Sequence, residues 1–210
     1  MSVKDYETRL YVKDDLSIGK SLVLKNDQSH YIRSVLRLKE NSQIALFNGE
    51  EGEWLSTIKI ISKKFVELEV IEQIKLQDVI SDIWLVFAPI KRTRIDYLAQ
   101  KATELGAGAL WPIFTKYTSV SRVNAERLRS NSIEAAEQSG RLTVPKILDP
   151  IDFDTLIEKW PHDRDLFCLD ETGRGAPILD AFRSSHQRAS GLLIGPEAVS
   201  YTHLRAHETG

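Results

Sequence analysis

The sequence changes its periodicity near residue 80, and this change constrains the possible folds more than any other feature. From Ile83 onward, unbroken apolar runs alternate with segments whose apolar residues recur every three or four positions. Unbroken runs are typical of strands buried on both faces, and the wider spacing is typical of helices that cover such strands. The sequence therefore predicts a parallel α/β sheet in the second part of the chain.

The predicted strands of this sheet are short, and a predicted helix follows most of them. The strands are residues 83–89, 109–114, 165–170 and 191–195, and the helices are residues 93–105, 125–139 and 153–160, with a further one from Pro177. The predicted buried stripe of the first helix is Ile95, Leu98, Ala99, Ala102 and Leu105. Gly106 and Gly140 are expected to end the first two helices, because glycine readily takes the left-handed conformation found there.

The first 75 residues are rich in β-branched and aromatic residues instead. Five runs read as strands: residues 9–12, 21–24, 43–47, 54–61 and 65–74. One helix is expected to begin at Asn26 or Asp27 as its cap and to continue to Arg37, and Asn48-Gly49 predicts a hairpin turn with Gly52 available for a bulge. We expect a small β-barrel over residues 1–76 and the α/β domain over residues 77–197.

Composition narrows the class of protein. The chain has 210 residues, 42% of them hydrophobic and 28% charged, and a net charge of −2, which is typical of a soluble globular protein. The longest apolar runs are too short to span a bilayer, and the first residues lack the pattern of a signal peptide, so no membrane partner is expected. The single cysteine, Cys168, is expected to be a packed core residue in a cytoplasmic protein.

Clustered cations at two places suggest contact with phosphate. Lys91, Arg92 and Arg94 stand at the start of a predicted helix, where they oppose the helix dipole. Arg33 and Arg37 are four residues apart and should share one face of the first-domain helix beside aromatic residues, and their guanidinium groups could meet phosphate or stack on bases. The alternatives are a solvated surface turn at the first place and an ordinary amphipathic helix at the second.

Two further segments mix small, charged and amide residues on predicted helices. KATELG, residues 101–106, places Lys101 and Glu104 on one stripe with Tyr97, where an ion pair between them is the alternative to a functional role. EAAEQSGR, residues 134–141, places Gln138 and Arg141 at a helix end. No phosphate-binding loop or dinucleotide fingerprint is present, and the spacing of His203 and His207 lacks an acidic partner, so no metal site is expected.

These segments, in this order, resemble the RsmE family of SPOUT-class RNA methyltransferases. The matching stretches are RLYV, HYIRSVLRL, APIKRTRIDYLAQKATELGAGALWPIFTKYTSV, EAAEQSGRLTVPKI, LFCLDETG and LLIGPE, which span residues 9–197. The resemblance implies a PUA-like barrel for RNA docking, followed by an α/β domain with a trefoil knot. It also implies a homodimer that uses S-adenosylmethionine to methylate N3 of a uridine in bacterial 16S ribosomal RNA of the small subunit.

The resemblance, together with the local patterns, assigns roles to particular residues. Glu104, Gln138 and Arg141 are the candidates for positioning the base, helping with its proton or stabilising charge. The donor pocket should be lined by Leu169, Asp170, Glu171, Gly195, Pro196 and Glu197. The candidates for RNA contact are Arg9, Arg33, Arg37, Lys91, Arg92 and Arg94.

The family pattern breaks after Glu197. The family continues with glycines, an acidic helix and a knot-closing segment, whereas residues 199–209 of this chain resemble one reading frame of a sequencing adapter, with Ala198 at the junction. We therefore expect residues 198–210 to be a non-native tail, and donor binding and stability to be impaired. Two other functions stay open at this point: a non-catalytic RNA-binding protein, and a methyltransferase acting on another nucleotide of ribosomal or transfer RNA.

Overall fold

The chain forms two compact units. The computed structural model describes residues 6–79, 81–90, 92–116, 118, 120–169, 175–185 and 189–195, with the backbone alone at residues 92 and 93. The first unit is Met1–Val79 together with Ala136–Thr143, and the second is Ile80–Ala135 together with Val144–Gly210. A short stretch around the end of a helix in the second half of the sequence is thus grouped with the N-terminal residues.

A five-stranded sheet is the framework of the first unit. Its strands are β1 (Arg9–Tyr11), β2 (Ser21–Lys25), β3 (Gln43–Phe47), β4 (Glu53–Ile61) and β5 (Phe65–Lys75), in the order β1-β3-β4-β5-β2. The β1–β3 pair is parallel, and the other pairs are antiparallel. Alternate residues such as Leu22 and Leu24 are buried, as expected for strands with one face on a core. The five predicted strands of this unit are confirmed.

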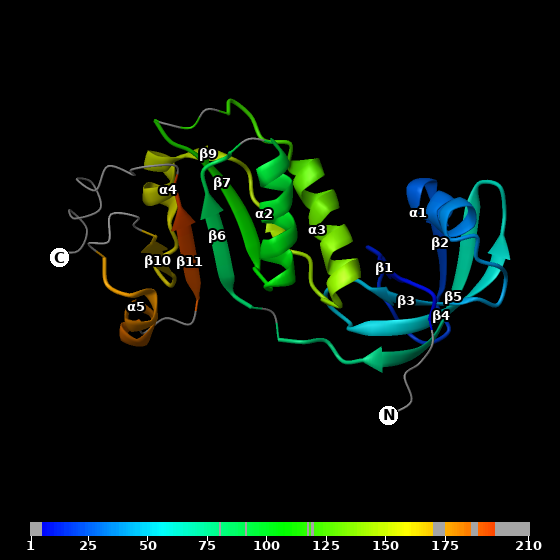
Figure 1. Ribbon diagram of the computed structural model, residues 1–210. Helices are drawn as coiled ribbons and strands as arrows, with labels where there is room; N and C mark the ends of the chain where they lie inside the picture. The colour runs from blue at the N-terminus through cyan, green and yellow to red at the C-terminus, as the bar shows by residue number, and fades with distance from the viewer. Residues whose placement is uncertain are drawn as a thin grey trace. The chain divides into compact units, whose positions relative to one another are not determined.

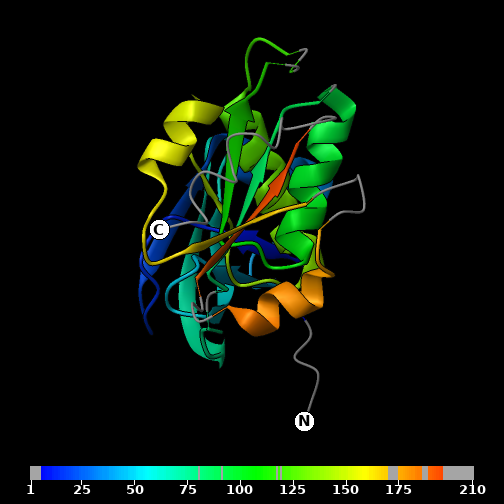
Figure 2. The same ribbon diagram turned by 90° about the vertical axis from the view of Figure 1, so that its left-hand side faces the viewer.

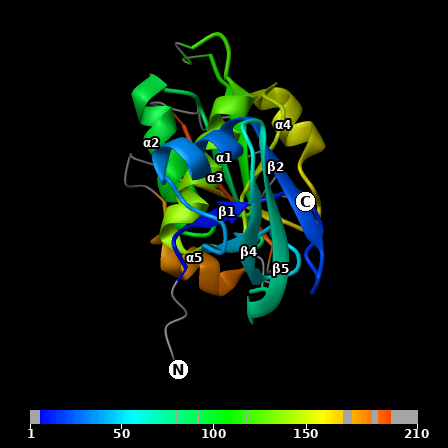
Figure 3. The same ribbon diagram turned by 90° about the vertical axis from the view of Figure 1, so that its right-hand side faces the viewer.

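The helix of the first unit differs from its prediction. It consists of α1 (Asn26–His30), which is labelled in Figure 3, followed directly by a π-helical turn, η1 (Tyr31–Val35). The N-cap position is held by Lys25, whose side chain makes no capping hydrogen bond. Arg37 lies beyond the helix in the left-handed region, with a φ of 55°. The expectation that Arg33 and Arg37 share one helical face is therefore wrong, because the helix widens and ends between them.

The β3–β4 connection is a tight turn that requires its glycines. Asn48 Oδ1 accepts hydrogen bonds from the backbone N–H groups of Glu50 and Glu51, at 3.0 and 3.1 Å. Gly52 has a φ of 79°, and a Cβ atom there would lie 2.2 Å from the carbonyl oxygen of Lys75. The turn predicted from Asn48-Gly49 is thus present, and Gly52 allows β5 to pass close beside it.

The second unit is built on a parallel sheet, as predicted. Its strands are β6 (Ile83–Phe87), β7 (Ala109–Phe114), β8 (Lys146–Ile147), β9 (Ile151–Asp152), β10 (Asp165–Cys168) and β11 (Ser190–Ile194). The order is β10-β11-β6-β7-β8, with β9 paired to the end of β7, and each of these pairs is parallel. The strands β8 and β9 were not predicted, because two residues are too short to show a period.

Helices cover both faces of this sheet (Figures 1 and 2). The helices α2 (Arg92–Glu104) and α3 (Ala125–Ser139) bury Ala99, Ala102 and Leu128 against Phe87 and Leu110 on one face. On the other face, α4 (Phe153–Lys159) buries Leu156 against Val86, Ile113 and Leu193. A last helix, α5 (Ile178–Ser184), contacts β10 through the rings of Phe182 and Phe167, whose centroids are 4.5 Å apart.

Two predictions about core residues have different outcomes. Leu105 was expected on the buried stripe of α2, but its side chain is 82% exposed. It lies one residue after the helix ends, where Gly106 turns the backbone with a φ of 87°. Cys168 is half-buried and packs against the core on the α4 side of the sheet, in agreement with a packing role.

Candidate active site

The carboxyl ends of β6 and β11 bring two loops together at one edge of the parallel sheet. Phe87 pairs with Ile194 in the ladder, and the backbone N–H of Ala88 donates a hydrogen bond to the carbonyl oxygen of Ile194 at 3.1 Å. The chain segments that follow these strands therefore begin side by side. This edge is where parallel α/β sheets bind their ligands.

Two of the six residues expected to line a donor pocket lie at this edge. Leu169 follows β10, and its backbone N–H donates to the carbonyl oxygen of Leu193 at 3.0 Å. Gly195 follows β11 directly. The other four, Asp170, Glu171, Pro196 and Glu197, lie outside the described residues.

Apolar side chains are exposed beside these positions. Leu169 is 43% exposed and Ile194 is 40% exposed, although each stands at the end of a strand whose neighbours are largely covered. Exposed apolar side chains at a sheet edge provide a surface on which a planar ring can pack. This part of the site can therefore accept a ligand with an apolar face.

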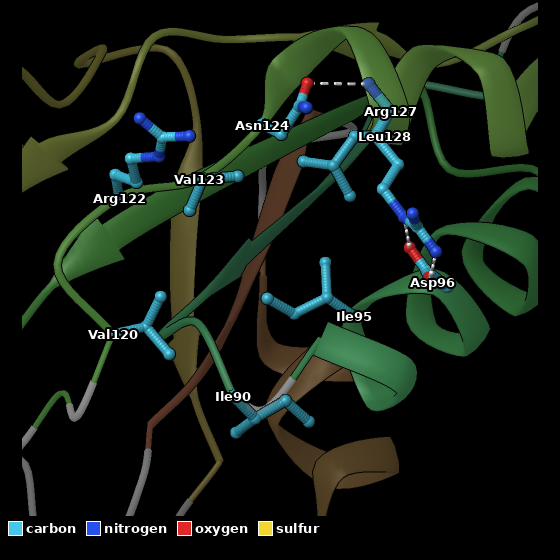
Figure 4. Close-up of a pocket in the computed structure, with 9 residues that line it drawn as sticks. All are labelled: Ile90, Ile95, Asp96, Val120, Arg122, Val123, Asn124, Arg127 and Leu128. Carbon is cyan, nitrogen blue, oxygen red and sulfur yellow. Dashed lines mark hydrogen bonds and ion pairs between the residues drawn. The ribbon is translucent and has the colours of Figure 1, made fainter.

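A pocket of about 280 Å³ opens between the loops that follow β6 and β7 (Figure 4). Five apolar and four polar residues line it: Ile90, Ile95, Asp96, Val120, Arg122, Val123, Asn124, Arg127 and Leu128. The first comes from the loop after β6, the next two from α2, and the remainder from the segment that leads from β7 into α3. The pocket thus shares the carboxyl edge of the sheet with the expected donor loops.

An ion pair forms one side of this pocket. Asp96 accepts hydrogen bonds from Arg127 Nε at 2.8 Å, from Arg127 Nη2 at 2.5 Å and from Asn131 Nδ2 at 2.8 Å. The hydrogen bond that Arg127 donates to Asp96 raises the pKa of Arg127. Asn124 Oδ1 accepts from the backbone N–H of Arg127 at 3.0 Å and caps α3. The charge of Asp96 is therefore matched within the protein.

Arg122 lies on the opposite side of the pocket and is exposed (Figure 4). Neither a hydrogen bond nor an ion pair joins it to another residue in the part of the chain that the structure describes. Of the residues that line this pocket, the sequence analysis named only Ile95, as part of a buried helical stripe, and it selected none as a functional residue. The available signal was Asn124 at the start of a helix, with one cation two residues before it and another three residues after it.

The structure confirms the stripe predicted for α2. Lys101 Nζ lies 3.0 Å from Glu104 Oε1 and 2.7 Å from Oε2, and it stands 5.6 Å from the centre of the Tyr97 ring. The hydrogen bond from Lys101 lowers the pKa of Glu104, and the same bond raises the pKa of Lys101. The ion pair that the sequence left as an alternative is thus present, and it favours the ionised form of Glu104.

Gln138 and Arg141 stand at the end of α3, in the part of the chain grouped with the first unit. Gln138 is exposed and Arg141 is half-buried. Glu104 belongs to the second unit. The three candidates are therefore divided between the two units, whereas the domain bounds expected from the sequence placed all three in the α/β domain.

Arg9 is a correction, because its side chain is used inside the protein. It is 9% exposed and is paired with Glu53, which is 8% exposed. Its guanidinium also donates to the carbonyl oxygens of Ala136, Glu137 and Arg141, at 2.9, 3.0 and 3.0 Å, and it lies 4.6 Å from the centre of the Phe47 ring. These contacts satisfy carbonyls at the end of α3, so we assign Arg9 a structural role in place of RNA contact.

The other cations expected to contact RNA have varied surroundings. Arg33 is half-buried, and its Nε is buried without a hydrogen-bond partner in the described part of the chain. Arg37 and Arg94 are exposed. Arg92 begins α2, but its side chain and all of Lys91 lie outside the described residues.

Known families match both parts of the chain. A model described as an RNA methyltransferase domain matches residues 77–199, and one described as an RNA methyltransferase PUA domain matches residues 24–71. The curated protein "Ribosomal RNA small subunit methyltransferase E" of Rickettsia conorii is 33% identical over 190 residues, which are 90% of this chain and 78% of that protein. The chain belongs to the RsmE family of RNA methyltransferases.

Other RsmE proteins agree with this assignment. The protein of the same name from Synechocystis sp. is 28% identical over 194 residues, which are 90% of this chain and 63% of that protein. A crystal structure of the Neisseria gonorrhoeae enzyme bound to S-adenosyl methionine is 26% identical, with a TM-score of 0.81 over 90% of this chain and 79% of that one. The RsmE fold, with its two kinds of domain, is thus confirmed.

Two negative findings complete the description of this RsmE-family chain. Within the described ranges, no helix is both long and apolar enough to cross a bilayer. In the same ranges, no three histidine, cysteine, aspartate or glutamate side chains gather as metal ligands do. His203 and His207 lie outside the described residues.

Proposed function

We propose that this chain transfers a methyl group from S-adenosylmethionine to N3 of a uridine in 16S ribosomal RNA of the small subunit. The observation that carries the proposal is the 33% identity, over nine-tenths of the chain, to a protein named as a ribosomal RNA small subunit methyltransferase. The choice of uridine N3 comes from the family resemblance of the motifs around Glu104 and Gln138.

The described residues fit the donor. S-adenosylmethionine has an adenine ring, and the exposed Leu169 and Ile194 offer apolar contacts for it at the sheet edge. The backbone at Gly195 can approach such a ligand closely, because glycine has no side chain. When bound, the donor supplies an electrophilic methyl group on a positively charged sulfur.

The reaction places two demands on the protein. Uracil N3 carries an imide proton and is a poor nucleophile until that proton leaves to a base. The protein must also hold N3 in line with the donor methyl group, and orientation of this kind supplies much of the acceleration in such reactions. As N3 loses its proton, negative charge spreads to the neighbouring carbonyl oxygens, where a guanidinium group would stabilise it.

We assign Glu104 and Gln138 to positioning the base and Arg141 to stabilising its charge. The pKa of Glu104 is lowered by Lys101, so this carboxylate is a weak base. It is better suited to accepting a hydrogen bond from N3–H than to keeping the proton, which passes to water as N3 attacks the methyl group. Arg33, Arg37, Lys91, Arg92 and Arg94 are proposed to dock the RNA backbone.

We further propose a cytoplasmic homodimer. Tyr97 and Leu179 are large apolar side chains that are more than half exposed, as is Leu105. Exposed groups of this kind favour a second copy of the chain as a cover. Light scattering should give twice the mass of one chain, and a monomer at micromolar concentration would refute the dimer.

The deciding experiment measures methyl transfer from labelled S-adenosylmethionine to unmethylated small-subunit RNA and 30S particles. Because residues 198–210 depart from the family pattern, the assay uses the printed chain and one whose residues 198–210 are replaced by the matching stretch of the Rickettsia conorii protein. Mass spectrometry of the digested RNA should give 3-methyluridine. Another methylated nucleoside would refute the uridine N3 assignment, and no methylation by either chain would refute the function.

A further inference from the structure

The strand β1 lies at one edge of the five-stranded sheet, and side chains cover its open side. Among the described strands it pairs with β3 alone. The N–H of Val12 donates to Phe47 in β3, so that of the preceding Tyr11 faces away from the sheet. This N–H donates to Glu137 Oε1 at 2.9 Å, and the carbonyl oxygen of Tyr11 accepts from Gln28 Nε2 at 2.7 Å. The exposed edge of β1 thus holds the end of α3.

The last turn of α3 has an unfavourable charge for a helix end. All of this turn is described, and it carries Glu137 and no cation. A carboxylate at this end opposes the helix dipole. The guanidinium of Arg9 supplies the missing cation, because it donates to the carbonyl oxygens of Ala136 and Glu137 at 2.9 and 3.0 Å. A residue that breaks a local rule indicates a specific use, and the hydrogen bond from Tyr11 indicates what Glu137 does: it holds the helix end on β1.

Two residues that are proposed to act on the base lie in the turn after this contact. Gln138 follows Glu137 directly and is exposed, and Arg141 is half-buried. The carbonyl oxygen of Arg141 accepts from Arg9 Nη2 at 3.0 Å, and the next residue, Leu142, is 1% exposed. The backbone is therefore fixed on both sides of this turn, while the side chain of Gln138 stays accessible to a ligand.

We infer that Glu137 is a positioning residue for the proposed methyl transfer. Its carboxylate fixes the end of α3 on β1, and this contact sets where Gln138 and Arg141 meet the target base. Glu137 itself touches neither the base nor the donor. The inference rests on the proposed function. Because the reaction depends on alignment of the reacting atoms, a displacement of about 1 Å at the helix end can lower the rate about a hundred-fold.

The kinetic test uses variants of Glu137 in both chains of the methylation assay, the printed one and the one with the replaced C-terminal stretch. Glu137→Ala removes the acceptor for the Tyr11 N–H and should lower kcat about ten- to a hundred-fold, with KM for RNA unchanged. Glu137→Gln keeps an oxygen acceptor at the same place and should keep most of the wild-type kcat. Glu134→Ala is the matched control, since Glu134 is an exposed glutamate of the same helix, and it should keep the wild-type kcat.

A double-mutant cycle with Arg141→Ala shows whether Glu137 acts through a residue that it positions. Glu137→Ala should lower kcat less in the Arg141→Ala background than in the wild-type chain, because the two residues act together. Equal losses in the two backgrounds, or a wild-type kcat in Glu137→Ala, would overturn the inference. Weaker RNA binding by Glu137→Ala, measured well below its melting temperature, would also overturn it, because Glu137 would then contribute to docking.

Hydrogen exchange tests the same contact without requiring catalysis. Small-subunit RNA should slow amide exchange in residues 136–143 of the wild-type chain. At saturating RNA, Glu137→Ala should remove this slowing and Glu137→Gln should keep it. Slowing that is absent from the wild-type chain, or that survives Glu137→Ala, would overturn the inference even if the chain methylates RNA. Slowing that depends on Glu137 in a chain that methylates no RNA would instead refute the proposed function, and would leave Glu137 as a residue that orders the end of α3 around bound RNA.

Discussion

The sequence predicted that Arg9 contacts RNA, but in the structure its side chain is buried and binds other groups of the protein. Its guanidinium meets three carbonyl oxygens at the end of α3 and a buried carboxylate on β4. An arginine that binds RNA needs its N–H donors for the phosphate oxygens, whereas those of Arg9 are already bound to acceptors within the protein. In the first unit, the cations that we propose for RNA contact are therefore the exposed Arg37 and the half-buried Arg33.

Arg9→Met should destabilise the protein because it leaves the carboxylate of Glu53 buried without its partner. Breaking a buried ion pair from one side costs about 3–5 kcal/mol in free energy of unfolding. Urea denaturation measures the loss, and Arg9→Met combined with Glu53→Gln should recover part of it. RNA affinity measured well below the unfolding transition should stay unchanged. Unchanged stability with weakened RNA binding would contradict the structural role.

Glu104 gives a prediction about pH. Its pKa is lowered in the folded protein by the hydrogen bond from Lys101. The stabilisation is therefore present above the ordinary pKa of a glutamate, about 4.3, and is lost as the pH falls through the lower folded value. A carboxyl titration by NMR should place Glu104 below that ordinary value, and Lys101→Ala should return it upward. A titration of Glu104 near neutral pH would contradict this account and would favour a general base.

At the scale of secondary-structure elements, close packing between β11 and the tryptophan after α4 organises one face of the parallel sheet. Trp160 and Trp111 are stacked with ring centroids 6.1 Å apart, and Trp160 Nε1 donates to the carbonyl oxygen of Arg164 at 2.7 Å. A Cβ atom at Gly191 would lie 2.3 Å from the ring of Trp160. Gly191 is therefore needed so that the ring can rest on the strand.

Gly191→Ala should lower the free energy of unfolding by about 1–3 kcal/mol, the usual cost of overpacking a core. The two ring atoms nearest the added methyl group, Cη2 and Cζ2 of Trp160, are absent from phenylalanine. Trp160→Phe should therefore reduce the effect of Gly191→Ala in the double variant. Urea denaturation followed by tryptophan fluorescence measures both. Equal penalties in the two backgrounds would show that the ring is not what opposes the methyl group.

The sequence predicted best those helices and strands in which apolar residues recur at a regular spacing or a glycine marks the end. The bounds of α3 and the start of β10 agree with their predictions, because apolar spacing and Gly140 define them locally. The π-helical turn at Tyr31–Val35 depends on how Ile32 packs into the core, which no spacing shows. Within the site, the Lys101–Glu104 pair was predictable from its i,i+3 spacing. The pocket was not, since it joins residues from three separate segments.

At the scale of the whole molecule, charge limits how RNA can bind. The net charge is −2, so attraction to RNA must come from local groups of cations and not from the overall field. Contacts of this kind release counterions from the RNA, and the affinity then falls steeply with salt. Each phosphate contact makes the slope of log K against log salt steeper by a fixed amount.

Arg33→Ala should reduce the salt dependence of RNA binding by the amount that one phosphate contact contributes. For single-stranded RNA, the slope of log K against log salt should become shallower by about 0.7, because one phosphate contact is lost. Filter binding of small-subunit RNA at several salt concentrations measures the slope. Lys63→Ala is the matched control, since Lys63 is an exposed cation of the same unit with no proposed role. An unchanged slope with Arg33→Ala would mean that its guanidinium packs against the protein and does not meet the RNA backbone.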